Sequence, residues 1–412
     1  MNKIYEKVTP VLLGGDLNAY TMAASFAEAE GLISVCFARD NLAVCNLSSF
    51  VELHVVPNLD DVNVAVPELV RFAEGRREEK LFLIPCADWY VEMLEYARDK
   101  LEDYYFFHIP GFEVWRATSD KASFISILDK YGIEHPKTEI LDFELKELEH
   151  RGGKLKPPFV LKPADSTEYW RNPFDGMQKV YFPDSLGEVR EVAKRIFLSG
   201  YSGKLLLQEY VKGGGGRICA DASVLTVFMS SDGKAIKAVL GDVLLEELGK
   251  TSRGNYSVIV TRELDALSVK LIEMLEEIGY TGIANFDILR EGDKSYCLEL
   301  NPRQGRSFDY LRASGVNLAK LLLSELRGET GLSDFEYPSG VWRTVSRKTM
   351  IKYSTDKGLL NRALLLEKRG RLRTPYDYIE EKKISRKLYV LTHLLREGRR
   401  YKAIMKSGAV KE

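Results

Sequence analysis

The sequence is poor in the residues that build disulfide frameworks and zinc sites. Its 412 residues include five Cys and five His, with no Cys-x-x-Cys pair and no His at zinc-ligand spacing from a Cys. No stretch approaches 18 apolar residues, and the first residues lack the apolar core of a secretory signal. These absences argue against a disulfide-stapled secreted domain and against a membrane-spanning protein. They predict a cytoplasmic protein with buried, reduced thiols.

A strong net charge is also absent, and this argues against a general nucleic-acid binder. The chain has 59 Lys and Arg against 60 Asp and Glu, a formal net charge of −1. Its length predicts several domains, and 45% hydrophobic with 29% charged residues is typical of globular proteins. The balance conceals an asymmetry, because residues 339–412 hold 20 Lys and Arg but seven Asp and Glu. The remaining residues therefore carry a net charge of −14 against +13 in this basic segment.

The first 115 residues alternate strand-like and helix-like patterns. Strands are expected at 11–13, 33–37, 53–56 and 81–84, and helices at 18–30, 64–74 and 90–101. Such alternation predicts a Rossmann-like α/β domain with a parallel, doubly wound sheet. The Gly14-Gly15 turn is either a tight connection or an approach site for an anionic ligand, with substrate favoured over nucleotide. Asp88, at a strand end, is equally a ligand contact or a helix cap.

Residues 116–330 read as a second, α+β domain with much antiparallel sheet. Helices are expected at 121–131, 142–149 and 186–198, and strands near 157–163, 179–182 and 205–211. Residues 331–412 are predicted to form a basic, helical C-terminal extension.

The strongest chemical signal is a hairpin made of Ile283–Leu289 and Tyr296–Asn301. Alternate residues of a strand share a face, so Glu299, Asn301 and Arg303 point the same way. A register symmetric about Gly292 places Asp287 opposite Cys297 and diagonal to Glu299, on that same face. Two carboxylates this close are unfavourable unless a cation lies between them, and oxygen ligands favour Mg²⁺ or Mn²⁺. The alternative is the exposed polar face of an ordinary hairpin.

Polar groups elsewhere in the second domain suit a nucleotide. Lys121 begins a helix and Lys162 ends a strand, and lysine is a point charge suited to phosphate oxygens. The loop 164–176, which contains Ser166, is able to present backbone amides to a phosphate chain. Glu209 and Val211, at the end of an apolar strand, are suited to adenine. Individually, each lysine is more commonly a solvated surface charge.

The order of these features resembles the ATP-grasp family. A helix-start Lys, a strand-end Lys with a polar loop, a Q-E-Y-V strand end and then D-x11-E-x-N-P-R follow one another over roughly residues 1–330. The resemblance implies a pre-ATP-grasp domain followed by two subdomains that clasp ATP. It assigns phosphates to Lys121, Lys162 and Ser166, and adenine to Glu209 and Val211. It assigns Mg²⁺ to Asp287, Glu299 and Asn301, and the reacting carboxylate or phosphate to Arg303.

Three further segments resemble the carboxylate–amine ligase branch that includes the D-aspartate ligases of peptidoglycan synthesis. They are Leu244–Glu247, Arg253–Tyr256 and Asn301–Ser307. The branch tends to carry acidic residues after its hinge glycine, where this chain has Gly213–Gly216, and Asp221 is the candidate for the ribose contact instead. Arg253, Asn255, Arg303 and Arg306 are the candidates for gripping substrate.

The resemblance implies an ATP- and Mg²⁺-dependent ligase that works through an acyl phosphate. A carboxylate attacks the γ-phosphate of ATP while Mg²⁺, Lys121, Lys162 and Arg303 neutralise the developing charge, and an amine then displaces phosphate. Arg253 is a further catalytic candidate because it would grip the substrate carboxylate. The expected partners are ATP, an amino-acid or other carboxylate and an amine acceptor, without nucleic acid. The rival functions are an ATP-dependent carboxylase or carbamoyl-phosphate-type enzyme, and a non-catalytic nucleotide-binding regulator.

The basic segment has three interpretations. Its charged runs, at 368–373, 380–383 and 399–402, are by default a solvated helical surface. They also suit docking on an anionic membrane or attraction of a phosphate-bearing substrate.

Overall fold

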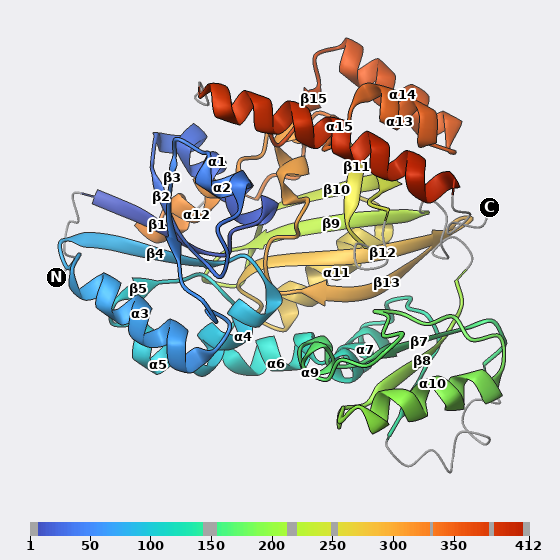
Figure 1. The fold of residues 1–412 in the computed structure, drawn as a ribbon. Coiled ribbons are helices and arrows are strands. Elements are labelled where there is room, and N and C mark those ends of the chain that lie inside the picture. The colour runs from blue at the N-terminus through green and yellow to red at the C-terminus, as the bar shows by residue number, and fades with distance from the viewer. Residues whose placement is uncertain are drawn as a thin grey trace.

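Three β-sheets carry the fold in the computed structural model, which describes residues 7–142, 155–211, 221–248, 254–329, 333–378 and 383–406. A parallel sheet near the N-terminus and a large sheet in the centre lie side by side, and a small sheet stands apart below them (Figure 1). No helix in these ranges is both long and apolar enough to cross a membrane. The thiols of Cys36, Cys45, Cys86 and Cys297 are free and buried, as predicted, and Cys219 lies outside the described ranges.

The N-terminal domain is a five-stranded sheet in the order β3-β2-β1-β4-β5, with every pair parallel. This confirms the predicted doubly wound α/β domain. Its strands are β1 (Lys7–Leu13), β2 (Ser34–Ala38), β3 (Val51–Val55), β4 (Glu79–Pro85) and β5 (Tyr105–Phe106). Its helices are α1 (Leu17–Glu30), α2 (Ala43–Asn46), α3 (Val62–Glu74), α4 (Asp88–Tyr96) and α5 (Arg98–Leu101). The single helix expected at 90–101 is thus divided in two.

The Gly14-Gly15 turn is required by close packing. Gly14 has φ 145°, and a Cβ on Gly15 would lie 2.6 Å from the Cβ of Ala38. Only a residue without a side chain fits at that distance. Asp16 then caps α1 by accepting hydrogen bonds from the backbone N–H groups of Asn18 and Ala19. The tight-connection interpretation therefore accounts for both glycines.

The small antiparallel sheet has the order β6-β8-β7. Its elements are β6 (Thr138–Leu141), β7 (Phe159–Pro163), α9 (Ser166–Arg171), α10 (Leu186–Leu198) and β8 (Leu205–Glu209), preceded by α6 (Phe112–Ser119) and α7 (Lys121–Lys130). The strand predicted at 179–182 is wrong, because only Tyr181 bridges to Leu161 there. Pro183 has no N–H with which to continue a ladder. The helix predicted at 142–149 falls almost entirely outside the described ranges.

The central sheet has seven strands in the order β13-β12-β9-β10-β11-β14-β15. They are β9 (Ala222–Met229), β10 (Ala235–Glu246), β11 (Tyr256–Arg262), β12 (Gly282–Glu291), β13 (Lys294–Asn301), β14 (Val341–Arg343) and β15 (Leu372–Arg373). Its helices are α11 (Ala266–Glu277), η3 (Phe308–Ser314), α12 (Leu318–Arg327), α13 (Arg347–Tyr353), α14 (Lys357–Lys368) and α15 (Ile384–Lys406). The C-terminal segment is therefore more than a helical extension, because it supplies two strands to this sheet.

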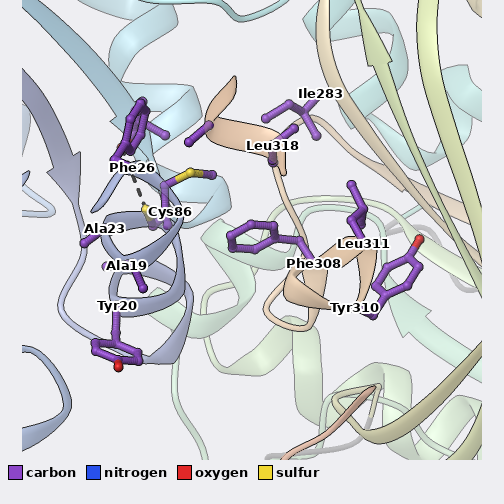
Figure 2. Packing of buried hydrophobic residues seen from close by; sticks show 14 of the residues in the cluster. Ala19, Tyr20, Ala23, Phe26, Cys86, Ile283, Phe308, Tyr310, Leu311 and Leu318 are labelled. Carbon is purple, nitrogen blue, oxygen red and sulfur yellow. Dashed lines mark hydrogen bonds between the residues drawn. The ribbon is translucent and has the colours of Figure 1, made fainter. Parts of the chain in front are cut away.

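The N-terminal domain shares a hydrophobic core with the central domain. Figure 2 shows Ala19, Ala23 and Phe26 of α1 on one side of this core and Phe308 and Leu311 of η3 on the other. The two parts also approach closely at Gly282, where a Cβ would lie 2.7 Å from the backbone oxygen of His108. Because this contact is tightly packed, it fixes where the end of β4 lies relative to β12 and β13.

Candidate active site

The hairpin β12–β13 brings two carboxylates directly opposite each other. Asp287 pairs with Glu299, whereas the predicted register placed it opposite Cys297. The prediction was wrong because the turn holds two residues, Gly292 and Asp293, and because a β-bulge follows the pair of Ile288 and Cys297. The bulge inserts one extra residue into β13. It brings the two carboxylates closer than the predicted diagonal would.

The same bulge changes which residues fill the core behind the hairpin. Cys297 and Leu300 are buried in one cluster with Phe286 and Ile288, while Leu298 is half-buried. Because side chains alternate along a strand, moving the register of one strand by a single residue exchanges its two faces. The carboxylates remain on the face that points away from this core.

The Asp287–Glu299 pair places two negatively charged groups next to each other. Burial, and then the negative charge of Glu299, raise the pKa of Asp287 to about 7. The hydroxyl of Tyr256 donates to Asp287 Oδ1 at 2.9 Å, and Asn301 Nδ2 lies 3.5 Å from Asp287 Oδ2. Tyr256 was missed from the sequence as a site residue, because β11 is a separate strand. This arrangement favours binding of a cation.

The charges of three lysines from the small-sheet side act on Glu299. Lys121 Nζ lies 3.9 Å from Glu299 Oε2 and donates to the backbone oxygen of Ala164 at 3.2 Å. Burial opposes the charge of Glu299, but Lys121, Lys179 and Lys162 together lower its pKa. Burial lowers the pKa of Lys162 to about 8, although Glu299 favours its charged form. The two predicted lysines are brought together with the carboxylates, as expected.

Lys179 is a site residue that the sequence reasoning missed. Its charge acts on Asp287, Glu299 and Lys162, and its Nζ would lie 3.7 Å from a Cβ on Gly254. The available signal was the position of Lys179 shortly after the polar loop 164–176. The sequence reasoning instead took Lys179 as the first residue of the strand predicted at 179–182. Lys179 therefore lies between the small sheet and the chain that leads into β11.

Arg303 joins the hairpin to the N-terminal domain. Its Nη2 donates to Asp88 Oδ2 at 2.9 Å and to Asn301 Oδ1 at 3.4 Å, and its Nη1 donates to the backbone oxygen of Gln304 at 3.2 Å. Asp88 makes no helix-capping hydrogen bond at the start of α4, so it is an ion-pair partner and the capping role is wrong. Within the described ranges the buried Nε of Arg303 has no hydrogen-bond acceptor. One donor of this guanidinium is therefore free for a ligand.

A second cluster of candidate substrate residues gathers around Glu247. Arg306 Nη1 donates to Glu247 Oε1 at 2.5 Å, and its Nε lies 3.9 Å from Asp16 Oδ2. Asn255 Nδ2 lies 3.5 Å from Glu247 Oε2. The structure thus brings Asn255 and Arg306 together through a shared carboxylate. Arg253, the third predicted member, lies outside the described ranges.

The predicted adenine and ribose residues lie apart from the carboxylate pair. Glu209, at the end of β8, lies 3.5 Å from Lys137 Nζ, and Val211 is buried just beyond it. Asp221 is exposed before β9, where its backbone oxygen accepts from the N–H of Arg290. Ser166 is the first residue of α9, which Asp165 caps. No hydrogen bond within the described ranges joins Glu209, Val211 or Asp221 to the carboxylates, and the nucleotide roles of all four residues stay predictions.

The donor set fits a divalent ion that shares its ligands with a substrate. No three His, Cys, Asp or Glu side chains in the described part of the chain gather at one point. Asp287, Glu299 and the amide of Asn301 would therefore supply the protein oxygens, with phosphate oxygens or water as the remaining ligands. This is the sharing that Mg²⁺ shows in phosphate-binding sites.

No family model matches the chain, but a similar curated protein covers nearly all of it. D-aspartate ligase of Enterococcus faecium (strain Aus0004) is 30% identical over 400 residues, which are 94% of each chain. The chain belongs to the ATP-grasp carboxylate–amine ligases. The large chain of carbamoyl phosphate synthase from Halobacterium salinarum is also similar to this chain, but its 31% identity extends over only 140 residues. These residues are 32% of this chain and 13% of the synthase chain.

Solved structures share the fold of the ligase at low identity. The biotin carboxylase domain of Hydrogenobacter thermophilus 2-oxoglutarate carboxylase, crystallised with MgADP, ADP and bicarbonate, has a TM-score of 0.60 at 15% identity over 81% of this chain and 73% of that one. L-amino acid ligase from Bacillus licheniformis has a TM-score of 0.54 at 16% identity over 79% and 76%. Both likenesses confirm the predicted architecture of the ligase.

Proposed function

We propose that this ligase uses ATP and Mg²⁺ to activate the carboxylate of an amino acid as an acyl phosphate and then joins it to an amine. The carboxylate oxygen attacks the γ-phosphorus, ADP leaves, and the amine attacks the acyl carbon and expels phosphate. The carrying observation is the direct pairing of Asp287 with Glu299, with Lys121 Nζ 3.9 Å from Glu299 Oε2 and the charges of Lys162 and Lys179 acting on the same carboxylate. Two opposed carboxylates facing three ammonium groups suit a site where a cation and a polyphosphate meet.

The lysines and Arg303 stabilise negative charge on the transferring phosphoryl group. Lys162 and Lys179 act as point charges near Glu299, and Lys121 is held in place by the backbone of Ala164. A bound Mg²⁺, held by Asp287, Glu299 and Asn301, would supply electrostatic stabilisation of phosphate oxygens. No described residue is needed as a covalent nucleophile, because positioning and electrostatics account for catalysis of this kind.

The amino-acid carboxylate has a candidate site at Arg303 and the Glu247 cluster. The unpartnered Nε of Arg303 is a buried donor, and a buried donor without an acceptor is costly unless a ligand supplies one. Arg306 and Asn255 form a second group of candidate donors, and both contact the carboxylate of Glu247. A planar guanidinium recognises a carboxylate through two parallel hydrogen bonds. We assign Arg253 to this group from its place in the sequence two residues before Asn255.

We infer that the amino acid is D-aspartate and that the acceptor is an amine of a peptidoglycan precursor. The support is the 30% identity to an enzyme named D-aspartate ligase over 94% of both chains. The carboxylase alternative rests on partial matches to carbamoyl phosphate synthases, which cover between 32% and 55% of this chain and at most 20% of those proteins. A non-catalytic regulator has no need to keep both carboxylates and three lysines in one place. We also propose a cytoplasmic location, because the proposed reaction consumes ATP.

The test of the substrate is phosphate release from ATP and Mg²⁺ with a panel of D- and L-amino acids, with and without a muropeptide precursor. We expect release with D-aspartate that rises when the precursor is added, and mass spectrometry of the product should show one added aspartyl residue. Release that depends on bicarbonate and not on an amino acid would contradict the proposal.

The test of the site is Glu299→Gln, with Glu273→Gln on the exposed side of α11 as the matched control. We expect Glu299→Gln to reduce ligation by a factor of about 100 or more, as loss of one electrostatic stabiliser does. It should also remove the Mg²⁺-dependent part of the thermal stabilisation by ATP, while the control keeps both. Ligation near the unmodified rate would show that the assignment of Glu299 is wrong.

A further inference from the structure

The C-terminal helix α15 is fixed to the molecule by one face only. At its start, the guanidinium of Arg386 donates to the backbone oxygen of Val44 at 2.7 Å and lies 4.0 Å from the ring centroid of Tyr20. Near its end, Tyr401 is fully buried, stacks on Tyr353 and donates to Ser257 Oγ at 2.9 Å. The helix therefore spans from the N-terminal domain to the central sheet along the outside of the molecule (Figure 1).

The opposite face of α15 carries a row of exposed large apolar side chains. Ile384 is 76% exposed, Leu388 58%, and Leu391 and Leu395 55% each. Their spacing of four, three and four residues places them in one stripe over three turns. Single exposed leucines are ordinary on protein surfaces, but a continuous row is a mark of an interaction site. The residues that attach the helix leave this row unused.

Basic residues flank and extend this stripe. Between residues 383 and 406 there are eight Lys and Arg and one acidic residue, Glu397. Lys387 and Arg399 border the stripe, and Lys402 continues its line into the last turns of the helix. All three side chains are exposed. A second copy of this helix would bring like charges together. An apolar row between cationic side chains instead complements a surface with anionic headgroups over hydrocarbon.

We propose that the outer face of α15 docks the ligase on an anionic membrane surface. The helix lies in the plane of the interface, with Leu388, Leu391 and Leu395 in the acyl boundary and the basic residues among lipid phosphates. This is peripheral binding, in keeping with the finding that no helix of the described residues is able to cross a membrane. It is a property of the surface and does not depend on which amino acid the enzyme uses.

Docking through α15 would place the membrane beside the candidate substrate site. The inner face of the helix carries His393, whose ring lies 5.6 Å from that of Tyr376 and 6.0 Å from that of Tyr389. The charges of Glu247 and Arg306 act on His393 and on Glu397. One helix thus faces the Glu247–Arg306 cluster on its inner side and solvent on its outer side. Lipid-linked acceptors would meet the site with a short approach.

The experiment is co-sedimentation of the full-length protein with vesicles of phosphatidylcholine alone or mixed with phosphatidylglycerol. Binding is expected only to the anionic vesicles, and it should fall in 0.5 M salt because screening shortens the reach of the basic residues to about 4 Å. The triple variant L388Q/L391Q/L395Q should lose at least about 10-fold in affinity, since each half-exposed leucine loses its burial in lipid. Lys387→Gln with Lys402→Gln should weaken binding less and reduce its salt dependence.

The matched control is Leu198→Gln with Val269→Gln, two exposed apolar residues on α10 and α11. This control should bind vesicles like the unmodified protein. Far-ultraviolet circular dichroism and ATP-dependent phosphate release in solution should be unchanged in every variant. Equal binding by the leucine triple variant would overturn the proposal, as would equal binding to neutral vesicles. A concentration-dependent dimer that the triple variant abolishes would assign the stripe to self-association instead.

Discussion

The ion pair between Asp88 and Arg303 predicts that the N-terminal domain takes part in catalysis, and Asp88→Asn tests this. The substitution keeps the shape of the side chain and removes its charge. Arg303 Nη2 would then face a neutral amide in place of the carboxylate that accepts from it at 2.9 Å, while the weaker contacts of the guanidinium to Gln304 and Asn301 stay in place. We expect the guanidinium to remain in the site but to be less well oriented.

The size of the effect follows from the exposure of the two partners. Hydrogen bonds between charged groups contribute about 1.5–3 kcal/mol. The side chain of Asp88 is 51% exposed and that of Arg303 15%, so solvent screening reduces the expected value to about 1 kcal/mol. A loss of about 1 kcal/mol corresponds to a fall of about 5-fold in kcat/KM for the amino acid. Arg303→Lys, which loses the planar fork, should cost about 100-fold.

Steady-state phosphate release at saturating ATP measures this effect for Asp88→Asn, Arg303→Lys and the double variant. If the pair acts as a unit, the double variant should be little worse than Arg303→Lys alone. The matched control is Asp60→Asn, because Asp60 forms a 3.0 Å pair with Arg39 at a surface where both side chains are nearly half exposed. Fully additive losses, or an equal loss in the control, would refute a catalytic role for the contact.

Three further predictions concern other parts of the molecule. Lys179→Met should lower kcat at least about 10-fold with little change in stability, because it removes one of the three lysine charges that act on Glu299. Single-turnover phosphate release measures this effect, and an unchanged rate would show that the residue is only structural. Trp342→Ala should cost about 4 kcal/mol of unfolding free energy in urea titrations, since Trp342 is 1% exposed in β14, whereas the exposed Trp170→Ala should cost under about 0.5 kcal/mol. Burial lowers the pKa of His108, so the unfolded chain takes up a proton on this residue at a higher pH than the folded chain. The free energy of unfolding should therefore fall as the pH drops through about 6.5. His108→Gln should flatten that slope, and an identical slope would contradict the reasoning.

The hairpin and the parallel sheet were predictable because their signals are local. Strand-like runs separated by helix-like runs determine a doubly wound sheet, and the order β3-β2-β1-β4-β5 agrees with that prediction. The alternation along β13 determines that Glu299 and Asn301 share a face, whatever the partner strand does. The same locality predicted α10, whose apolar residues recur at helical spacing and whose bounds are those expected from the sequence.

The register of the hairpin was not predictable, because it depends on one extra residue. A bulge costs little locally and is set by how β12 packs between β9 and β13. Nothing in the sequence shows that Tyr256, Lys179 and Asp88 come together, because Tyr256 lies in a strand of the central sheet, Lys179 in a loop beside the small sheet and Asp88 in a helix of the N-terminal domain. Only packing of the domains against one another brings them together.

In the C-terminal segment, too, some features follow from the sequence alone and others depend on the tertiary structure. Its excess of Lys and Arg, and the spacing of its leucines, are properties of the sequence alone. That Val341–Arg343 joins β11, and that α15 buries Arg386 and Tyr401 while leaving Leu388 and Leu395 exposed, was decided by the tertiary structure. Periodicity determines which residues lie together on one face of a helix. Which face meets the protein and which meets the solvent depends on the surface that the rest of the chain offers.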